Sequence, residues 1–117
     1  MQSIEVLGEQ EFSSDKMKKV SLFDTANLFC DLYCLRPGQS QKPHTHQGAD
    51  KIYFVLQGRG TFVVGEEEKV LEAGEIVLAP SGAVHGVTNH TPQPLNLLVV
   101  MAPNPNRQPG GTRKTRG

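Results

Sequence analysis

Residues 74–89 read GEIVLAPSGAVHGVTN, a short apolar run, a Pro-Ser-Gly loop and a second run that ends in asparagine. The runs 76–79 and 84–89 have the length of β-strands, and Pro80 and Gly82 between them are turn formers. Similar short runs recur along the chain, with turn signals about every eight to twelve residues and no helical periodicity. The pattern predicts an all-β sandwich or barrel.

The same reading divides the chain into one small domain and a tail. At 117 residues the chain has the length of a single domain. We expect strands over 4–7, 20–23, 27–35, 52–56, 61–64, 69–71, 76–79, 84–89 and 95–101. The barrel is predicted to occupy residues 1–102. Residues 103–117 are rich in Pro and Gly, and we expect them to form a flexible tail that is too polar to pack.

Charge gives no sign of a nucleic-acid or membrane partner, because 12 basic residues balance 12 acidic ones. The basic residues of the tail are Arg107, Arg113, Lys114 and Arg116. Four charges in a flexible end are more often solubilising than nucleic-acid-binding. No apolar run approaches the roughly 20 residues that span a bilayer. The N-terminus lacks the basic and apolar regions of a signal peptide, so we expect a cytoplasmic protein.

Three histidines have spacings that suit one metal site. A single residue separates His44 from His46, and His85 follows 39 residues later in another strand-like run. Side chains two residues apart on a strand share a face and lie roughly 6.7 Å apart. Imidazoles so placed can bind one ion at about 2.1 Å each, and a third from a neighbouring strand completes a three-sided site. By strand parity His90 faces away from His85, so we leave it out.

The chain around these histidines resembles the two signature motifs of the cupin superfamily. Residues 38–58 read GQSQKPHTHQGADKIYFVLQG and resemble the first motif, G-x5-H-x-H-x(3,4)-E-x6-G. Residues 74–89 match the second, G-x5-P-x-G-x2-H-x3-N, at every defined position. The matching residues are Gly38, His44, His46, Gly58, Gly74, Pro80, Gly82, His85 and Asn89. The first motif departs at its acid, where this chain has Lys51.

The resemblance implies a small cupin jelly-roll barrel whose lumen holds a divalent transition metal, Fe, Mn, Ni, Cu or Zn, on His44, His46 and His85. It implies a small-molecule substrate or ligand, and often a homodimer. Cupins include enzymes, so a metal-dependent oxygenase, such as a dioxygenase, or an isomerase is one expectation. The alternative is a non-catalytic ligand-binding or sensing module, because fold does not dictate reaction.

Lys51 leaves three arrangements open. A charged ammonium about 4 Å from a unit positive charge costs about 4 kcal/mol at an effective dielectric of 20. Lys51 can turn away and pair with an acid, which leaves three histidines and water around the metal. Asp50 can replace the missing acid through a local bulge, although normal strand parity points it away. In the third arrangement the site holds no metal and Lys51 binds an anion.

Strand parity also predicts the assembly. Ile52, Phe54 and Leu56 share one face of their strand, whereas Tyr53 and Val55 share the face of the site. If the second set lines the lumen, the first needs cover from another sheet or another subunit. A domain of this size cannot cover every strand generously, so we expect a homodimer.

Overall fold

The computed structural model of the chain describes residues 1–107 and is almost entirely β-structure. Within these residues its elements are the 3-10 helix η1 (Val6–Glu9) and the strands β1 (Lys18–Asp24), β2 (Phe29–Leu35), β3 (Ser40–His44), β4 (Asp50–Gln57), β5 (Arg59–Val64), β6 (Glu67–Glu72), β7 (Ile76–Ala79), β8 (His85–Thr88) and β9 (Leu95–Ala102). None of the described helical structure is long or apolar enough to cross a bilayer. The predicted flexibility of residues 108–117 lies outside the described residues.

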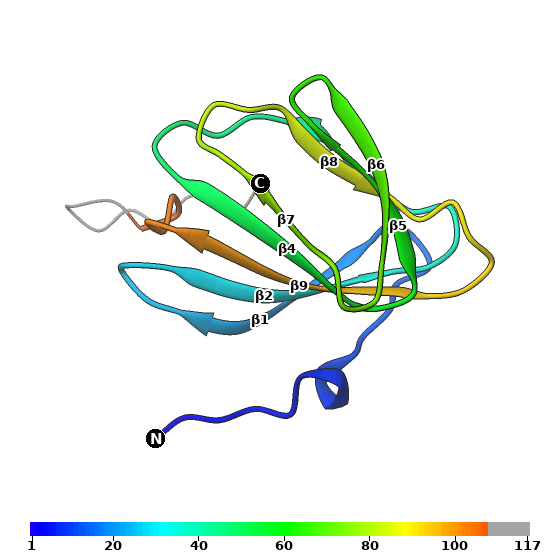
Figure 1. Cartoon of the computed structure of the whole chain (residues 1–117). Helices are drawn as coiled ribbons and strands as arrows, with labels where there is room; N and C mark the ends of the chain where they lie inside the picture. Colours follow the sequence, from blue (N-terminus) through cyan, green and yellow to red (C-terminus); the bar gives the residue numbers. More distant parts are fainter. Residues whose placement is uncertain (108–117) are drawn as a thin grey trace.

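The strands form two antiparallel sheets that face each other. One sheet has the order β1-β2-β9-β4-β7 and the other has the order β3-β8-β5-β6. Figure 1 shows the two sheets enclosing a common interior, with β1, β2, β9 and β4 on one side and β8, β5 and β6 on the other. The predicted all-β jelly-roll barrel is therefore confirmed.

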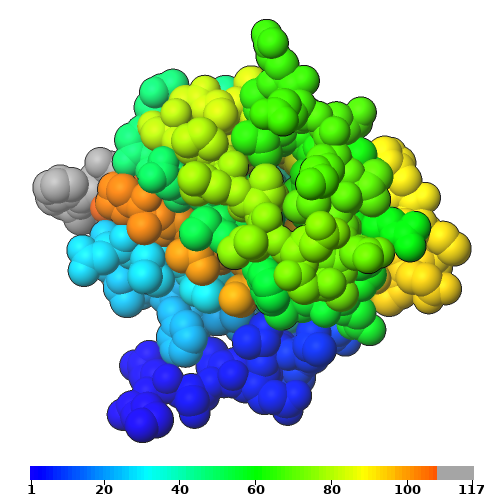
Figure 2. All heavy atoms as spheres, in the orientation of Figure 1, coloured from blue at the N-terminus to red at the C-terminus, as the bar shows by residue number. Residues whose placement is uncertain are grey.

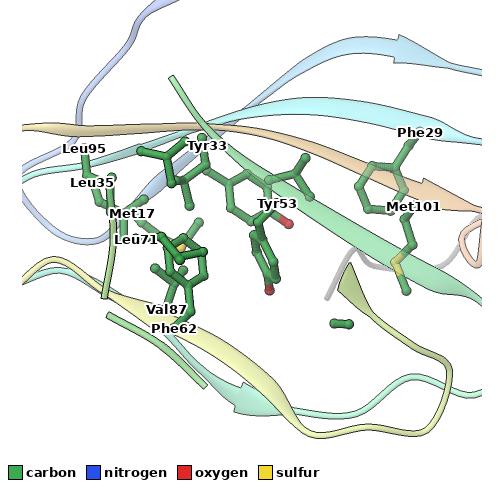
Figure 3. Packing of buried hydrophobic residues seen from close by; sticks show 14 of the residues in the cluster. Met17, Phe29, Tyr33, Leu35, Tyr53, Phe62, Leu71, Val87, Leu95 and Met101 are labelled. Carbon is green, nitrogen blue, oxygen red and sulfur yellow. The ribbon is translucent and has the colours of Figure 1, made fainter. Parts of the chain in front are cut away.

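The core is the lumen between the sheets. Odd-numbered residues of β2, β4 and β9 point inward, and residues of β5, β6 and β8 meet them from the opposite sheet. The largest of these side chains are Phe29, Tyr33, Leu35, Tyr53, Phe62, Leu71, Leu95, Leu97 and Met101. Figure 3 shows the two tyrosines in the middle, with Phe62 and Leu71 towards one end and Phe29 and Met101 towards the other. Burying each such side chain stabilises the fold by about 1.5–3 kcal/mol.

Two strand predictions need correction. The expected strand over 4–7 is wrong, because that segment has no strand partner within the described residues and turns into η1 instead. The turn is closed by a hydrogen bond of 3.1 Å from the Gly8 amide to the Glu5 carbonyl. Glu67 and Glu68, expected in a turn, belong to β6. Their side chains are exposed, so a strand at the edge of its sheet accommodates their charge.

The first five residues of the predicted tail, 103–107, pack against the barrel. Asn104 is buried, and its amide nitrogen donates to the Asp24 carboxylate at 3.0 Å and to two carbonyls of the β1–β2 connection. The Arg107 guanidinium meets the same Asp24 at 2.7 Å. The expectation that the chain stops packing after Ala102 is therefore wrong for this segment. Its polar side chains are held by hydrogen bonds rather than by apolar burial.

Candidate metal centre

The structure brings all three predicted histidines together. His44 is the last residue of β3 and lies directly opposite His85, the first residue of β8. Their ring centroids are 4.4 Å apart, and the His46 ring lies 4.8 Å from His44 and 5.4 Å from His85. His46 lies two residues beyond the end of β3. Of the His44–His46 pair, only His44 therefore lies on the strand, as both were predicted to do. His90 is exposed and lies near Thr61, outside this cluster.

The imidazoles are prepared to donate lone pairs. The Nδ1 atoms of His44 and His85 lie 2.8 and 3.1 Å from the carbonyls of Lys42 and Ala83. A carbonyl only accepts, so each Nδ1 carries the proton and each Nε2 keeps its lone pair, as in most metal-ligating histidines. Burial, with a smaller effect of the Lys51 charge, lowers the pKa of His85 to about 4. His85 is therefore neutral at physiological pH.

The donor atoms have a spacing close to that of a metal site. One ligand atom from each histidine lies within 4.8 Å of the others. Two donors at about 2.1 Å from one ion are at most about 4.2 Å apart, so small ring rotations suffice. The backbone supports this arrangement, because the His46 carbonyl accepts a hydrogen bond of 2.7 Å from the Gly82 amide in the loop before His85.

Gly86 lets the two histidine-bearing strands approach each other. A Cβ atom at Gly86 would lie 2.8 Å from the carbonyl oxygen of Gln41 and 2.9 Å from the nitrogen of Pro43. Real Cβ atoms essentially never come so close to backbone. Gly86 was not among the predicted site residues. Its signal was a glycine inside a strand pattern, which often marks close backbone approach.

Lys51 lies inside the barrel, although the family motif has an acid at its position. Its side chain is fully buried, and its ammonium lies 5.3 Å from the Tyr33 ring centroid and 5.1 Å from that of Tyr53. Burial first, and the Lys19 charge second, lower the pKa of Lys51 to about 7. The carboxylate of the buried Asp31 acts in the opposite direction. Lys51 therefore does not turn away from the lumen, and the acid that acts on it there is the buried Asp31.

Asp50 does not take the place of the missing acid. It is exposed, and its carboxylate accepts a hydrogen bond of 2.9 Å from the Ser81 amide. Asp50 and Lys51 pair with consecutive residues of β9, Ala102 and Met101, so no bulge turns Asp50 inward. The alternative that used Asp50 as a ligand is therefore wrong, for the reason of strand parity.

A chain of hydrogen bonds lies beside the cluster. The Tyr53 hydroxyl donates to the Gln41 side-chain carbonyl at 2.7 Å, and the Gln41 amide contacts the Tyr33 hydroxyl at 3.5 Å. The Tyr53 ring centroid is 6.2 Å from that of His85. Burial raises the pKa of Tyr53 well above its ordinary value, so it keeps its proton. Sequence reasoning identified Tyr53 as inward-facing but gave no sign of Gln41 or Asp31.

A pocket opens at the histidine end of the barrel. It has a volume of about 410 Å³ and is lined by Gln47–Ala49, which follow His46, and by residues of the segment 103–107. Ala49 is buried and belongs to the core cluster, directly before β4 begins at Asp50. A pocket of about 500 Å³ lies at the opposite end, where the lining charges are the exposed pair Arg59 and Glu72. The first pocket lies next to His46 in the chain, although none of the three histidines lines it.

Comparisons with known proteins agree with this geometry. The crystal structure of a Thermus thermophilus protein superposes with a TM-score of 0.88 at 43% sequence identity and covers 90% of this chain and 100% of that one. An uncharacterized protein of Streptomyces coelicolor is 38% identical over 79 residues, 66% of this chain and 71% of that protein. An oxalate-binding protein of Thermotoga maritima is 31% identical over 85 residues, 73% of this chain and 69% of the relative.

The family model for the cupin domain matches residues 31–101. This range contains all three histidines and runs from β2 to the end of β9. With most of the chain matched and the barrel and histidine cluster in place, this chain belongs to the cupin domain family.

Proposed function

We propose that His44, His46 and His85 bind one divalent transition-metal ion, and that this ion holds a small molecule. The buried Nε2 atom of His85 carries the proposal, because it has no hydrogen-bond partner within the described residues and belongs to the three-imidazole cluster. Imidazole nitrogen suits Fe(II), Mn(II), Ni(II), Cu(II) and Zn(II), so the donor set alone does not select the metal.

The ligand in this proposal is a small anion with a carboxylate group. The pocket lined by Gln47–Ala49, directly after His46 in the chain, has the size of small-molecule sites. Lys51 and Lys19 both lie close to Tyr33, and the charge of Lys51 acts on His85. The Thermotoga relative is named for binding oxalate, a small dicarboxylate. A bound metal would act there as a Lewis acid towards the oxygen atoms of the ligand.

Catalysis and simple binding use the same residues in this site. An oxygenase or isomerase needs a group that exchanges protons, and Lys51, with a pKa of about 7, can do so near neutral pH. A binding or sensing module needs only the ion and the pocket, and the name of the Thermotoga relative favours this second candidate. If the binding module holds no metal, Lys51 alone would bind the anion.

We also propose that the chain forms a homodimer. The side chains of Ile52, Phe54 and Leu56 are half-buried and face away from the lumen, as the parity argument predicted. Half-buried apolar side chains on an outer sheet face favour association with a second surface.

Metal content tests the proposal directly. Protein purified without an affinity tag and supplied in turn with Mn(II), Fe(II), Ni(II) and Zn(II) should retain about one ion per chain by elemental analysis. His85→Ala and His46→Ala should each abolish stoichiometric metal. His90→Ala is the matched control, because His90 is exposed and outside the cluster, and it should keep the metal. If the native protein takes up no metal, the proposal fails.

Ligand binding separates the remaining candidates. Calorimetric titration of oxalate into the loaded protein should show binding that is lost in the metal-free protein. Binding that survives metal removal but is lost in Lys51→Met would support the metal-free form instead. Consumption of oxalate, or of another small carboxylate, by the loaded protein would favour the enzyme over the module.

A further inference from the structure

The lumen of the barrel contains a primary amine. Of the lysines within residues 1–107, only Lys51 is fully buried. Its ammonium lies between two aromatic walls, 5.1 Å from the ring centroid of Tyr53 and 5.3 Å from that of Tyr33. Figure 2 shows how the atoms of the green and orange strands pack against one another over one face of the barrel. The amine is therefore kept away from bulk water, at the position where the family motif has an acid.

The surroundings of Lys51 are those that make a lysine nucleophilic. A lysine attacks carbon when it is desolvated or lies next to another cation, because its amine then has a lone pair near neutral pH. Both conditions are met here. Burial lowers the pKa of Lys51 first and the charge of Lys19 second, to about 7. About half of the Lys51 amines are therefore neutral near pH 7, where an ordinary lysine is almost fully charged.

We propose that the Lys51 amine forms an imine with the carbonyl carbon of a small 2-oxo acid. The nitrogen lone pair forms a bond to the carbonyl carbon, and both protons of the amine leave with the carbonyl oxygen as water. A carbon–nitrogen double bond remains, and neither an oxidant nor a reductant takes part. The carboxylate part of this ligand class rests on the proposed function, whereas the imine does not need the metal.

The charges around Lys51 favour a carbonyl compound that is also an anion. The ammonium groups of Lys19 and Lys51 both lie close to the Tyr33 ring, at 5.4 and 5.3 Å from its centroid. Within the described residues, Asp31 is the only carboxylate that is fully buried. Two cations and one anion leave one positive charge in excess, and a ligand carboxylate compensates it. The complete burial of Lys51 restricts the partner to small molecules, so glyoxylate and pyruvate are suitable probes.

Reductive trapping tests the proposal on the full chain. The protein, as purified and after removal of metal by chelation, is incubated with glyoxylate or pyruvate and cyanoborohydride, which converts an imine into a stable secondary amine. Peptide mass spectrometry should find the adduct on Lys51 about tenfold faster or more than on any other lysine, because exposed lysines are protonated at pH 7. Lys51→Arg keeps the charge and should lose this adduct. Lys69→Arg, at an exposed position, is the matched control and should keep it.

The pH dependence of trapping tests the role of the neighbouring charges. Lys19→Met removes a charge that lowers the pKa of Lys51, so the rate of adduct formation should rise only at higher pH. Asp31→Asn removes a charge that raises this pKa, so the rate should rise at lower pH. Tyr53 and His85 do not titrate in this range, because burial raises the pKa of Tyr53 and lowers that of His85 to about 4.

The outcomes separate the imine from the metal site. Adducts confined to exposed lysines overturn the inference, and so does an adduct on Lys51 that forms no faster than theirs. Shifts of the pH profile in the same direction for Lys19→Met and Asp31→Asn overturn the assigned activation. Stoichiometric metal without trapping on Lys51 keeps the metal proposal and overturns the imine. Trapping on Lys51 in a protein that takes up no metal supports the imine and overturns the metal site.

Discussion

The inner face of the five-stranded sheet carries Asp31 and Lys51 among aromatic side chains. On the outer face, a row of apolar side chains crosses β2, β9, β4 and β7, formed by Leu32, Leu98, Phe54 and Ile76. An antiparallel sheet with one solvated face normally buries apolar side chains and exposes polar ones, so two buried charged residues and an exposed apolar row both depart from the pattern. Burying a charge is costly unless it is compensated, and exposing a wide apolar patch favours association. The buried Asp31 and Lys51 are understandable if the inner face serves a site, and the exposed apolar side chains are understandable if the outer face serves an interface.

The two faces also differ in how they tolerate change. Inner residues contact one another across a closed lumen, so one substitution alters several contacts. The outer residues Ile76 and Leu78 are exposed in the single chain, whereas Leu32 is fully buried. A polar substitution at the exposed positions should therefore affect assembly more than folding. The following predictions use this difference, from the largest expected effect to the smallest.

Lys51→Glu should change the inner face most. It removes a cation and adds an anionic oxygen at the position where the family motif has its acid, so metal affinity should rise by about 100-fold. Without metal, the new carboxylate near Asp31 should lower the melting temperature. Competition titration with a chelating dye measures the affinity. Lys69→Glu, on the exposed part of β6, is the control and should leave the affinity unchanged. Loss of metal from Lys51→Glu alone would show that the lysine supports the site.

Gly86→Ala should disturb the pairing of β3 and β8, the two strands on which His44 and His85 lie. The added methyl group would meet the backbone at Gln41 and Pro43, which cannot move as a flexible side chain can. We expect a loss of about 1–3 kcal/mol in the free energy of unfolding and weaker metal binding, because β3 must move away from β8. Chemical denaturation and metal titration measure the two effects. Gly8→Ala, in η1, would meet only the Glu5 side chain at 3.5 Å, so metal binding should be unchanged there. Equal loss of metal in both variants would contradict this reasoning.

Lys51 should also give stability a characteristic pH dependence. Its pKa is about 7 in the folded chain and 10.5 ordinarily, so between these values the unfolded chain binds more protons. The free energy of unfolding should therefore rise with pH, by up to about 1.4 kcal/mol per pH unit. Above about pH 8.5 the cysteine thiols, whose pKa values are raised by burial, act in the opposite direction.

The measurement is urea denaturation of metal-free protein between about pH 7 and 8.5. Lys51→Met should flatten the slope in this window. Lys69→Met, at an exposed position, should keep it. A slope that survives in Lys51→Met must come from another group.

The outer face should affect the melting temperature only through the dimer, so its effect should depend on protein concentration. If unfolding is coupled to dissociation of a dimer, the melting temperature should rise by about 3 °C for each tenfold increase in concentration. The double variant Ile76→Glu with Leu78→Glu should melt at a temperature independent of concentration, close to that of the dilute native protein. Differential scanning fluorimetry over two decades of concentration suffices. If the melting temperature of the native protein does not depend on its concentration, the outer face does not stabilise the protein through a dimer.

Much of the site could be predicted from local sequence, because its residues lie at fixed spacings. The second motif fixed the loop from Pro80 to Gly82 and placed His85 at the start of a strand, as observed. The first motif placed His44 and His46 two residues apart. The segment 4–7 was misread because apolar content alone cannot tell a strand from a turn when no neighbouring strand is present. The segment 103–107 was misread because hydrogen bonds to a distant turn leave no periodic signal.

By itself, the sequence determined the fold class, the three histidines and the unusual lysine, because strand periodicity and motif spacing are short-range properties of the chain. Tertiary structure alone decided what surrounds Lys51: the rings of Tyr33 and Tyr53, the opposing carboxylate of Asp31 and the full burial that lowers its pKa. It also aligned apolar residues across the outer face, from Val20 to Ile76, since the register across five strands depends on pairings between residues far apart in the chain. Contacts of that kind exist only after the sheets have closed.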